Sequence, residues 1–289
     1  MWVLLAFITA IFTSFKDVCG RKALERAEYC VVAWAWTAFT IPFLFICALG
    51  EGFALVGTGF WPALICSGAI LSAASIMFFR AIKISDLSLS IPMLAFTPAL
   101  LLITSPLILG EYPKPLGVIG ILLIVFGSYV LNFGRRNKGL LEPFRHLLRD
   151  KGARLMLYIA IMYSIGGNID KIGVLNSSPS VWAFSVNLLV TIVLSIVVFA
   201  RVKDPVKSVS QTWKILFLMG VFSSIALIAQ MYAIRMTIVP YVIAIKRTSV
   251  MITVLFGVLL FKERGTIERL VGVVLMIIGV FIISFFATP

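Results

Sequence analysis

The sequence predicts an all-α membrane protein whose ten transmembrane helices form two inverted five-helix repeats. Three observations support this prediction. The first is composition, because the chain is 61% hydrophobic, has a mean hydropathy of +1.09 and is only 13% charged, whereas a soluble domain has roughly 25% charged residues. The second is that apolar runs of about 20 residues recur along the chain, and each is long enough to cross a bilayer. The third is that the second half of the chain repeats the residue pattern of the first.

The first repeat is expected to occupy residues 1–133. The N-terminal apolar run has no cations before it, so it is predicted to be a membrane helix and not a cleavable signal peptide. Pro92, Pro98 and Pro106 should interrupt or bend the fourth helix, as a hinge or as a static kink. The five helices are predicted at residue 2 to the low twenties, then at 30–49, 60–79, 87–109 and 116–133.

A polar, basic linker at 134–153 is the candidate boundary between the two halves. The second repeat is expected to occupy residues 154–289, and its helices are predicted at 154–175, 181–200, 213–233, 239–261 and 267–286. Each of these runs again approaches the length needed to span a bilayer.

The repeat is visible in matched residues that share one spacing along the chain. Ala81-Ile82-Lys83 matches Ala233-Ile234-Arg235, and the same spacing matches Glu111 with Glu263, Gly120 with Gly272 and Gly127 with Gly279. Because five helices per repeat is an odd number, the second copy must enter the membrane from the opposite side. Inverted repeats of this kind build transporters, with the substrate site near the membrane midplane.

The distribution of cations supports the inversion. The net charge is +13. Most of the 25 Lys and Arg residues lie in the loops that join predicted helices 1 and 2, 3 and 4, 5 and 6, 7 and 8, and 9 and 10. This bias falls on opposite loops of the two repeats, as inverted topology requires. The protein is expected in the cell (inner) membrane. Because cation-rich loops stay in the cytoplasm, the bias places the linker in the cytoplasm and both chain ends outside. Since the cations lie in short loops between apolar runs, membrane retention explains them better than nucleic-acid binding does.

Catalytic and metal-binding motifs are not evident. Cys19, Cys30, Cys47 and Cys66 form no CxxC motif, and His146 is the single histidine, so neither a metal site nor a disulfide framework is expected. The sequence also contains no P-loop, HExxH or GxSxG motif. We therefore expect a protein that is not an enzyme and that carries no cofactor.

The candidate substrate site lies in PYVIAIKRTSVMITVLFGVLLFKE, residues 240–263. This run is predicted to be one transmembrane helix, yet it contains adjacent Lys246 and Arg247, and charges at membrane depth usually face a partner or a water-filled cavity. On a continuous helix Lys246 shares a face with Ser249, Thr253 and Gly257. A guanidinium beside an ammonium suits a carboxylate or a phosphate. The matching residues of the first repeat are apolar, Leu94 and Ala95.

Other polar residues could complete or neutralise this site. Asp17 and Asp170 are candidate counter-ions for the two cations, or carriers of a coupling proton. The cations could then be paired inside the protein and not bind substrate, or Lys246 could extend toward the membrane surface. Gln230 and Tyr232 could donate hydrogen bonds into the same cavity, or they could hold helices together.

Glu111 and Glu263 lie just before helices, where a carboxylate is stabilised by the helix N-terminus. They are expected to be structural. In the inverted arrangement their contacts should run across the repeats, with Lys83 toward Glu263 and Arg235 toward Glu111.

The chain resembles the EamA type of the drug/metabolite transporter superfamily. Two segments carry the resemblance, LLITSPLILGEYPKPLGVIGILLIVFGSYVL and VLFGVLLFKERGTIERLVGVVLMIIGVFIIS, in which an apolar run, a glutamate and a glycine-containing helix follow one another. The resemblance implies ten helices in two inverted repeats. A narrower resemblance, KRTSV at residues 246–250, is to the triose-phosphate and nucleotide-sugar translocator branch. It implies that Lys246 and Arg247 bind a substrate phosphate.

These observations favour a secondary transporter that moves a small polar metabolite, with an anionic, phosphate- or carboxylate-bearing solute preferred, by alternating access. The alternative is an exporter of amino acids, drugs or other cationic or neutral metabolites on the same fold. A scaffold or receptor that does not transport is a further alternative. The expected partners are a small-molecule substrate and membrane lipid, and no nucleic acid.

Overall fold

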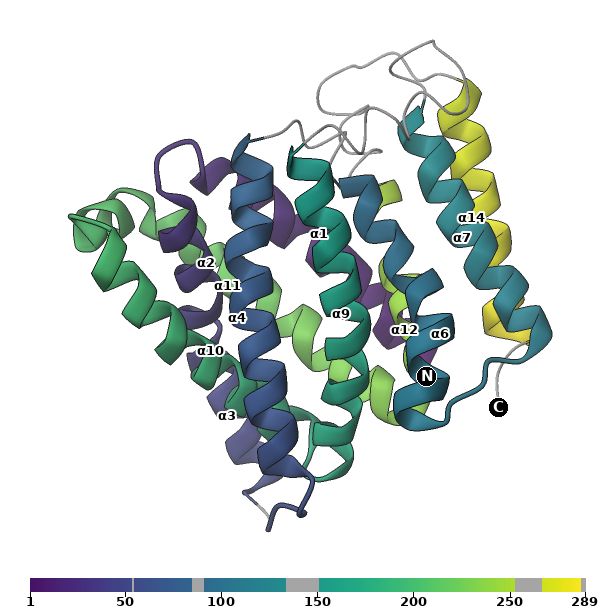
Figure 1. Cartoon of the computed structure of the whole chain (residues 1–289), viewed down its shortest axis with the longest axis horizontal. Helices are drawn as coiled ribbons and strands as arrows, with labels where there is room; N and C mark the ends of the chain where they lie inside the picture. The colour runs from purple at the N-terminus through teal and green to yellow at the C-terminus, as the bar shows by residue number, and fades with distance from the viewer. Residues whose placement is uncertain (54, 85–90, 134–150, 253–266, 287–289) are drawn as a thin grey trace.

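The structure of the protein is a computed structural model that describes residues 1–53, 55–84, 91–133, 151–252 and 267–286. Every regular element within these ranges is a helix, which confirms the predicted fold class. The helices lie side by side, and α1 begins on the same side of the bundle as α14 ends (Figure 1). The first repeat contains α1 (Trp2–Ala23), α2 (Tyr29–Ala38), α3 (Ile41–Glu51), α4 (Phe60–Ile84), η1 (Ile91–Phe96), α6 (Thr97–Leu109) and α7 (Pro115–Phe133).

The second repeat contains α9 (Lys151–Leu175), α10 (Pro179–Arg201), α11 (Pro205–Met236), α12 (Val239–Lys246) and α14 (Ile267–Phe286). Among the described residues, five segments are long and apolar enough to cross a membrane: α1, α2 with α3, α4, α10 and α11. The polar residues of α9 are accommodated because this helix packs against α4, α6, η1, α10, α11 and α12.

The second predicted helix, 30–49, is present as one segment long enough to cross a membrane, Tyr29–Glu51, and a turn at residues 39–40 divides it into α2 and α3. Pro42 is at the start of α3, where its missing N–H costs no hydrogen bond but prevents the preceding turn from continuing. The hydroxyl of Thr40 donates to the carbonyl of Trp36 at 2.6 Å, which satisfies an acceptor that the interruption leaves free.

Helix boundaries differ from the predictions in three further places. The fourth helix begins as the short η1, and α6 starts at Thr97, directly before Pro98. Pro98 therefore marks an interruption, whereas Pro106 lies inside α6 without ending it. The other two differences are helices that begin before the predicted residue, at Lys151 for α9 and Pro205 for α11. Hydropathy marks only the apolar part of a helix, so it misses such polar first turns.

The packing of α7 against α14 shows the inversion directly. These two helices run antiparallel and side by side (Figure 1), with Gly120 against Gly279 and Gly127 against Gly272. A Cβ on Gly127 would lie 2.7 Å from the carbonyl oxygen of Gly272, so a side chain there would push the helices apart. Gly120 of the first repeat matches Gly272 of the second, and Gly127 matches Gly279. Exchanging the two repeats therefore turns the Gly120–Gly279 contact into the Gly127–Gly272 contact. The same exchange relates the pairing of α1 with α11 to that of α4 with α9.

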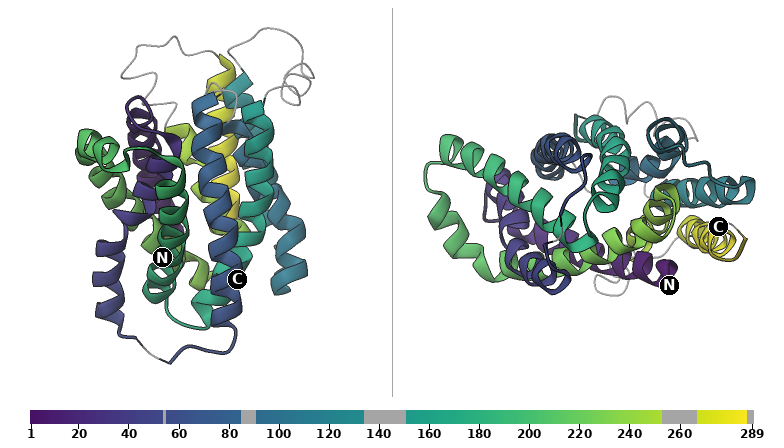
Figure 2. Two further views of the ribbon diagram at one scale, coloured as in Figure 1. Left: turned by 60° about the vertical axis from the view of Figure 1, so that its left-hand side comes forward. Right: turned by 90° about the horizontal axis from the view of Figure 1, so that it is seen from below.

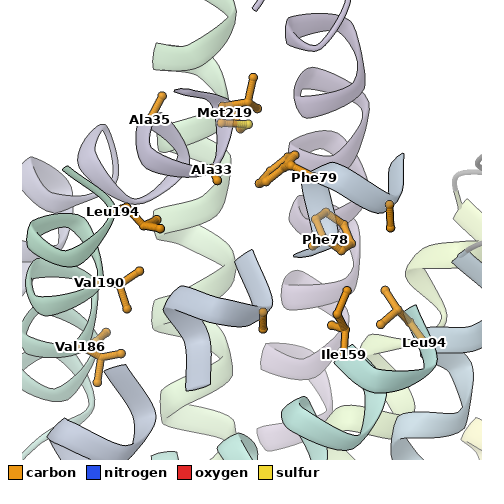
Figure 3. Close-up of a cluster of buried hydrophobic side chains, with 14 of the residues drawn as sticks. Ala33, Ala35, Phe78, Phe79, Leu94, Ile159, Val186, Val190, Leu194 and Met219 are labelled. Carbon is orange, nitrogen blue, oxygen red and sulfur yellow. The ribbon is translucent and has the colours of Figure 1, made fainter. Parts of the chain in front are cut away.

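The main hydrophobic core lies between helices of both repeats. It joins side chains from α2, α4, α10 and α11, including Phe79, Val190 and Met219, and extends through η1 and α9 at Leu94 and Ile159 (Figure 3). The α7–α14 pair lies at one end of the elongated cross-section, and the α10–α11 connection lies at the other (Figure 2). The candidate site therefore lies on elements that pack between these two ends.

Candidate functional site

The segment that carries Lys246 and Arg247 is not one continuous helix. α12 ends at Lys246, a turn at Arg247 and Thr248 follows, and helical structure resumes at Ser249. The hydroxyl of Thr248 donates to the carbonyl of Ile245 at 2.7 Å, and such local side-chain bonds compete with the regular helical pattern. The prediction that Lys246 shares one face with Ser249, Thr253 and Gly257 assumed an unbroken helix, and that assumption is wrong at Arg247 and Thr248. Thr253 itself lies outside the described residues.

The first repeat has an interruption at the matching position. There η1 ends at Phe96 and α6 begins at Thr97, which is the residue that matches Ser249 in the repeat. The two interruptions are joined, because the Nη2 of Arg247 donates to the Thr97 hydroxyl oxygen at 2.8 Å. Thr97 is fully buried, and its own hydroxyl donates to the carbonyl of Leu94 at 2.7 Å. Sequence reasoning missed Thr97, although the Thr-Pro pair at 97–98 marked the place.

Lys246 is partly buried and has a neutral partner. Its Nζ donates to the Oε1 of Gln230 on α11 at 2.6 Å, and Gln230 is only 6% exposed. Asp17 and Asp170 are near enough for their charges to act on Lys246, but among the described residues neither carboxylate forms an ion pair with it. The structure thus brings Gln230 and Lys246 together, as the sequence suggested.

Arg247 is also partly buried, and its guanidinium is only partly satisfied. One nitrogen bonds to Thr97, while the Nε atom is buried and has no hydrogen-bond partner in the described part of the chain. A buried donor that is left unpaired costs roughly 1–3 kcal/mol, and more when the group is charged. An incoming carboxylate or phosphate oxygen would supply the missing acceptor.

The two candidate carboxylates differ in their surroundings. Asp17 forms an ion pair with its neighbour Lys16, whose Nζ lies 2.9 Å from the carboxylate and 4.4 Å from the centre of the Trp36 ring. Asp170 is 6% exposed and accepts hydrogen bonds from the Ser67 hydroxyl at 2.7 Å and the Trp182 indole at 3.2 Å. Asp17 is therefore neutralised locally, whereas Asp170 is held by uncharged donors.

The remaining predicted residues have other positions. Ser249 is buried, and its carbonyl oxygen accepts a bond from the Ser14 hydroxyl at 2.9 Å. Tyr232 donates its hydroxyl proton to Glu51 at the end of α3, where Ser178 and the backbone N–H of Ser180 also bind. In the described residues Tyr232 thus ties α11 to α3 and α10, which is the alternative role that the sequence left open.

Glu111 has a partner that the sequence did not predict. Its carboxylate pairs with Lys171 of α9 and accepts the backbone N–H of Val239 at 3.0 Å. Lys171 also donates to the carbonyl of Thr237 at 2.9 Å, while Arg235 is exposed. The contact crosses the repeats as expected, but its partner is Lys171 and not Arg235. The proposed partner of Lys83, Glu263, lies outside the described residues.

The arrangement can hold an anion but offers no evident metal site. Within the described ranges, no three His, Cys, Asp or Glu side chains gather closely enough to bind a metal ion. What the site presents is a partly buried guanidinium with an open donor beside an ammonium.

Comparison with known proteins agrees with the fold. The model of the EamA-like transporter family matches residues 1–133 and 150–285. A solved structure titled "Crystal structure of protein" is similar over 99% of this chain and 99% of its own, with a TM-score of 0.80 and 16% sequence identity. At that identity the likeness shows the fold alone. The comparison with curated proteins gave no match.

Proposed function

The chain belongs to the EamA-like transporter family, and from this premise we propose that it moves a small anionic metabolite across the cell membrane by alternating access. Lys246 and Arg247 bind a carboxylate or phosphate group of the substrate, and Gln230 holds the Lys246 ammonium in place. Ser249 and Thr253 belong to the segment that follows the two cations and complete the proposed binding region.

The observation that carries this proposal is the guanidinium of Arg247. Its Nε atom is buried without a hydrogen-bond partner among the described residues, and no carboxylate in those residues forms an ion pair with it. A cation at membrane depth requires compensation. Because the protein supplies neutral partners, Thr97 for Arg247 and Gln230 for Lys246, a substrate anion is the fitting counter-charge.

The paired interruptions support the proposed mechanism. Broken helices at matching positions of two inverted repeats are the arrangement in which transporters place their substrate sites. Here the Arg247–Thr97 hydrogen bond links the two interruptions. Since rocking one repeat against the other would alter this contact, binding of an anion by Arg247 is coupled to the relative position of the repeats. Asp170, and secondarily Asp17, are the candidates for a coupling proton.

The proposal is tested by ligand-dependent thermal unfolding of the purified protein in detergent. A panel of phosphate- and carboxylate-bearing metabolites, with neutral and cationic compounds of similar size, is applied to the wild type and to Lys246→Ala/Arg247→Ala. Anions should raise the unfolding temperature of the wild type and leave that of the double variant unchanged. Lys203→Ala/Lys207→Ala is the matched control, because it removes two exposed cations. Equal anion effects in wild type and Lys246→Ala/Arg247→Ala, or stabilisation by cations alone, would contradict the proposal.

We also propose that the linker at 134–153 is cytoplasmic and that both chain ends are outside the cell membrane, as the distribution of cations indicates. A phosphatase reporter fused after residue 289 should then be active, and one inserted in the linker should be inactive. A fluorescent-protein reporter, which folds in the cytoplasm, should give the opposite pattern. Activity of the phosphatase only when it is in the linker would reverse the proposed orientation.

A further inference from the structure

The charges of the described side chains that are not exposed do not cancel. Among them, Lys16 pairs with Asp17 at 2.9 Å and Lys171 pairs with Glu111, so these four side chains contribute no net charge. Three charged side chains remain, and we call them the central charges: Asp170, Lys246 and Arg247. With Asp170 ionised, the central charges sum to one positive charge.

Each central charge is bonded to neutral groups of the protein. Asp170 accepts from Ser67 and Trp182, Lys246 donates to Gln230, and Arg247 donates to Thr97. Their charges are therefore balanced by one another at a distance, or by a ligand. Lys246 is the charged group on the surrounding described helices whose field acts on Asp170. The carboxylate whose field acts on Arg247 is Asp17, which Lys16 already pairs, so no unpaired carboxylate of the described residues balances the Arg247 charge.

The surroundings of Asp170 can accommodate its carboxyl group in both the ionised and the protonated form. Both of its hydrogen bonds, from Ser67 and from Trp182, reach the same oxygen, Oδ1. The second oxygen, Oδ2, receives no hydrogen bond from the described residues, so it is the atom on which a proton would bind. Ser67 and Trp182 are fully buried and fix the carboxylate whichever charge it carries.

We propose that Asp170 selects the charge of the transported anion. While Asp170 is ionised, the central charges require one negative charge for balance, and the site takes a monoanion. When Asp170 is neutral, two positive charges remain and the site takes a dianion together with the proton on Oδ2. The physical reason is that a net charge in a low-dielectric interior is costly. This inference rests on the proposed function, since it assumes that Lys246 and Arg247 bind the anion.

The test compares sulfate with methyl sulfate, two anions of the same chemistry that carry two charges and one. Their dissociation constants are measured at pH 7 and matched ionic strength by thermal unfolding of the full chain. In the wild type methyl sulfate should bind at least as tightly as sulfate. In Asp170→Asn, which has the shape of aspartate without the charge, the affinity for sulfate relative to methyl sulfate should rise by about tenfold or more.

Two variants keep the test decisive. Asp170→Glu retains the charge and should keep the wild-type preference, while Asp170→Ser serves if the asparagine variant does not fold. A ratio that stays within about twofold of wild type in the neutral variants, while Lys246→Ala/Arg247→Ala abolishes binding of both anions, would overturn the role of Asp170 and leave the proposed function intact. Binding that the double variant does not weaken would instead remove the proposed function itself.

Discussion

Replacing Lys171 with Gln is expected to lower the free energy of unfolding by about 3 kcal/mol, because it leaves Glu111 charged and without its ion pair. The two side chains are only 11% and 13% exposed, so water cannot fully replace the lost partner. Glu111→Gln should cost a similar amount, since Lys171 would then be unpaired and the bond from Val239 N–H to the carboxylate would weaken.

The coupling between these residues is measured by a double-mutant cycle of thermal or denaturant unfolding in detergent. Glu111→Gln/Lys171→Gln should be more stable than the sum of the single losses implies, because residues in direct contact are not additive. Arg235→Gln is the control, since it removes an exposed cation from the same region and should change stability by less than about 0.5 kcal/mol. If Arg235→Gln lost as much stability as Lys171→Gln, the effect would come from removing a positive charge from this region and not from breaking the Lys171–Glu111 ion pair.

The two cations of the site should be unequal, with Arg247→Ala weakening anion binding by about 100-fold and Lys246→Ala by about tenfold. The charge of Lys246 is partly offset by Asp170, and its ammonium is bonded to Gln230 at 2.6 Å. The carboxylate that acts on Arg247 is Asp17, which is already paired with Lys16, and Arg247 keeps a buried, unpaired Nε for the ligand. The measurement is a titration of each variant with the anion that most stabilises the wild type.

Arg247→Lys separates charge from geometry in the same experiment. It keeps the positive charge but cannot supply both the bond to Thr97 and a second donor in the fixed geometry of a guanidinium. We expect it to bind more tightly than Arg247→Ala and less tightly than wild type. If Lys246→Ala were the more damaging substitution, the assignment of the uncompensated charge to Arg247 would be wrong.

These residues also show how far sequence reasoning reaches. Matched glycines predicted a repeat, and Gly120, Gly127, Gly272 and Gly279 indeed pack α7 against α14. The distinction between Lys16–Asp17 and Asp170 was not predictable, because both carboxylates lie in apolar runs. Their difference depends on Ser67 and Trp182, which are distant from each other along the chain and meet Asp170 only in the folded bundle.

The sequence by itself determined the membrane class, the two repeats and the adjacent Lys246 and Arg247, since hydropathy, spacing and residue type are local or periodic properties. The tertiary structure decided which partners these groups have. In the folded protein the helix is interrupted after Lys246, and Arg247 donates a hydrogen bond to Thr97 of the other repeat. Glu111 pairs with Lys171 and not with Arg235. Such choices depend on distances between helices that are far apart in the chain. No pattern along a single helix records them.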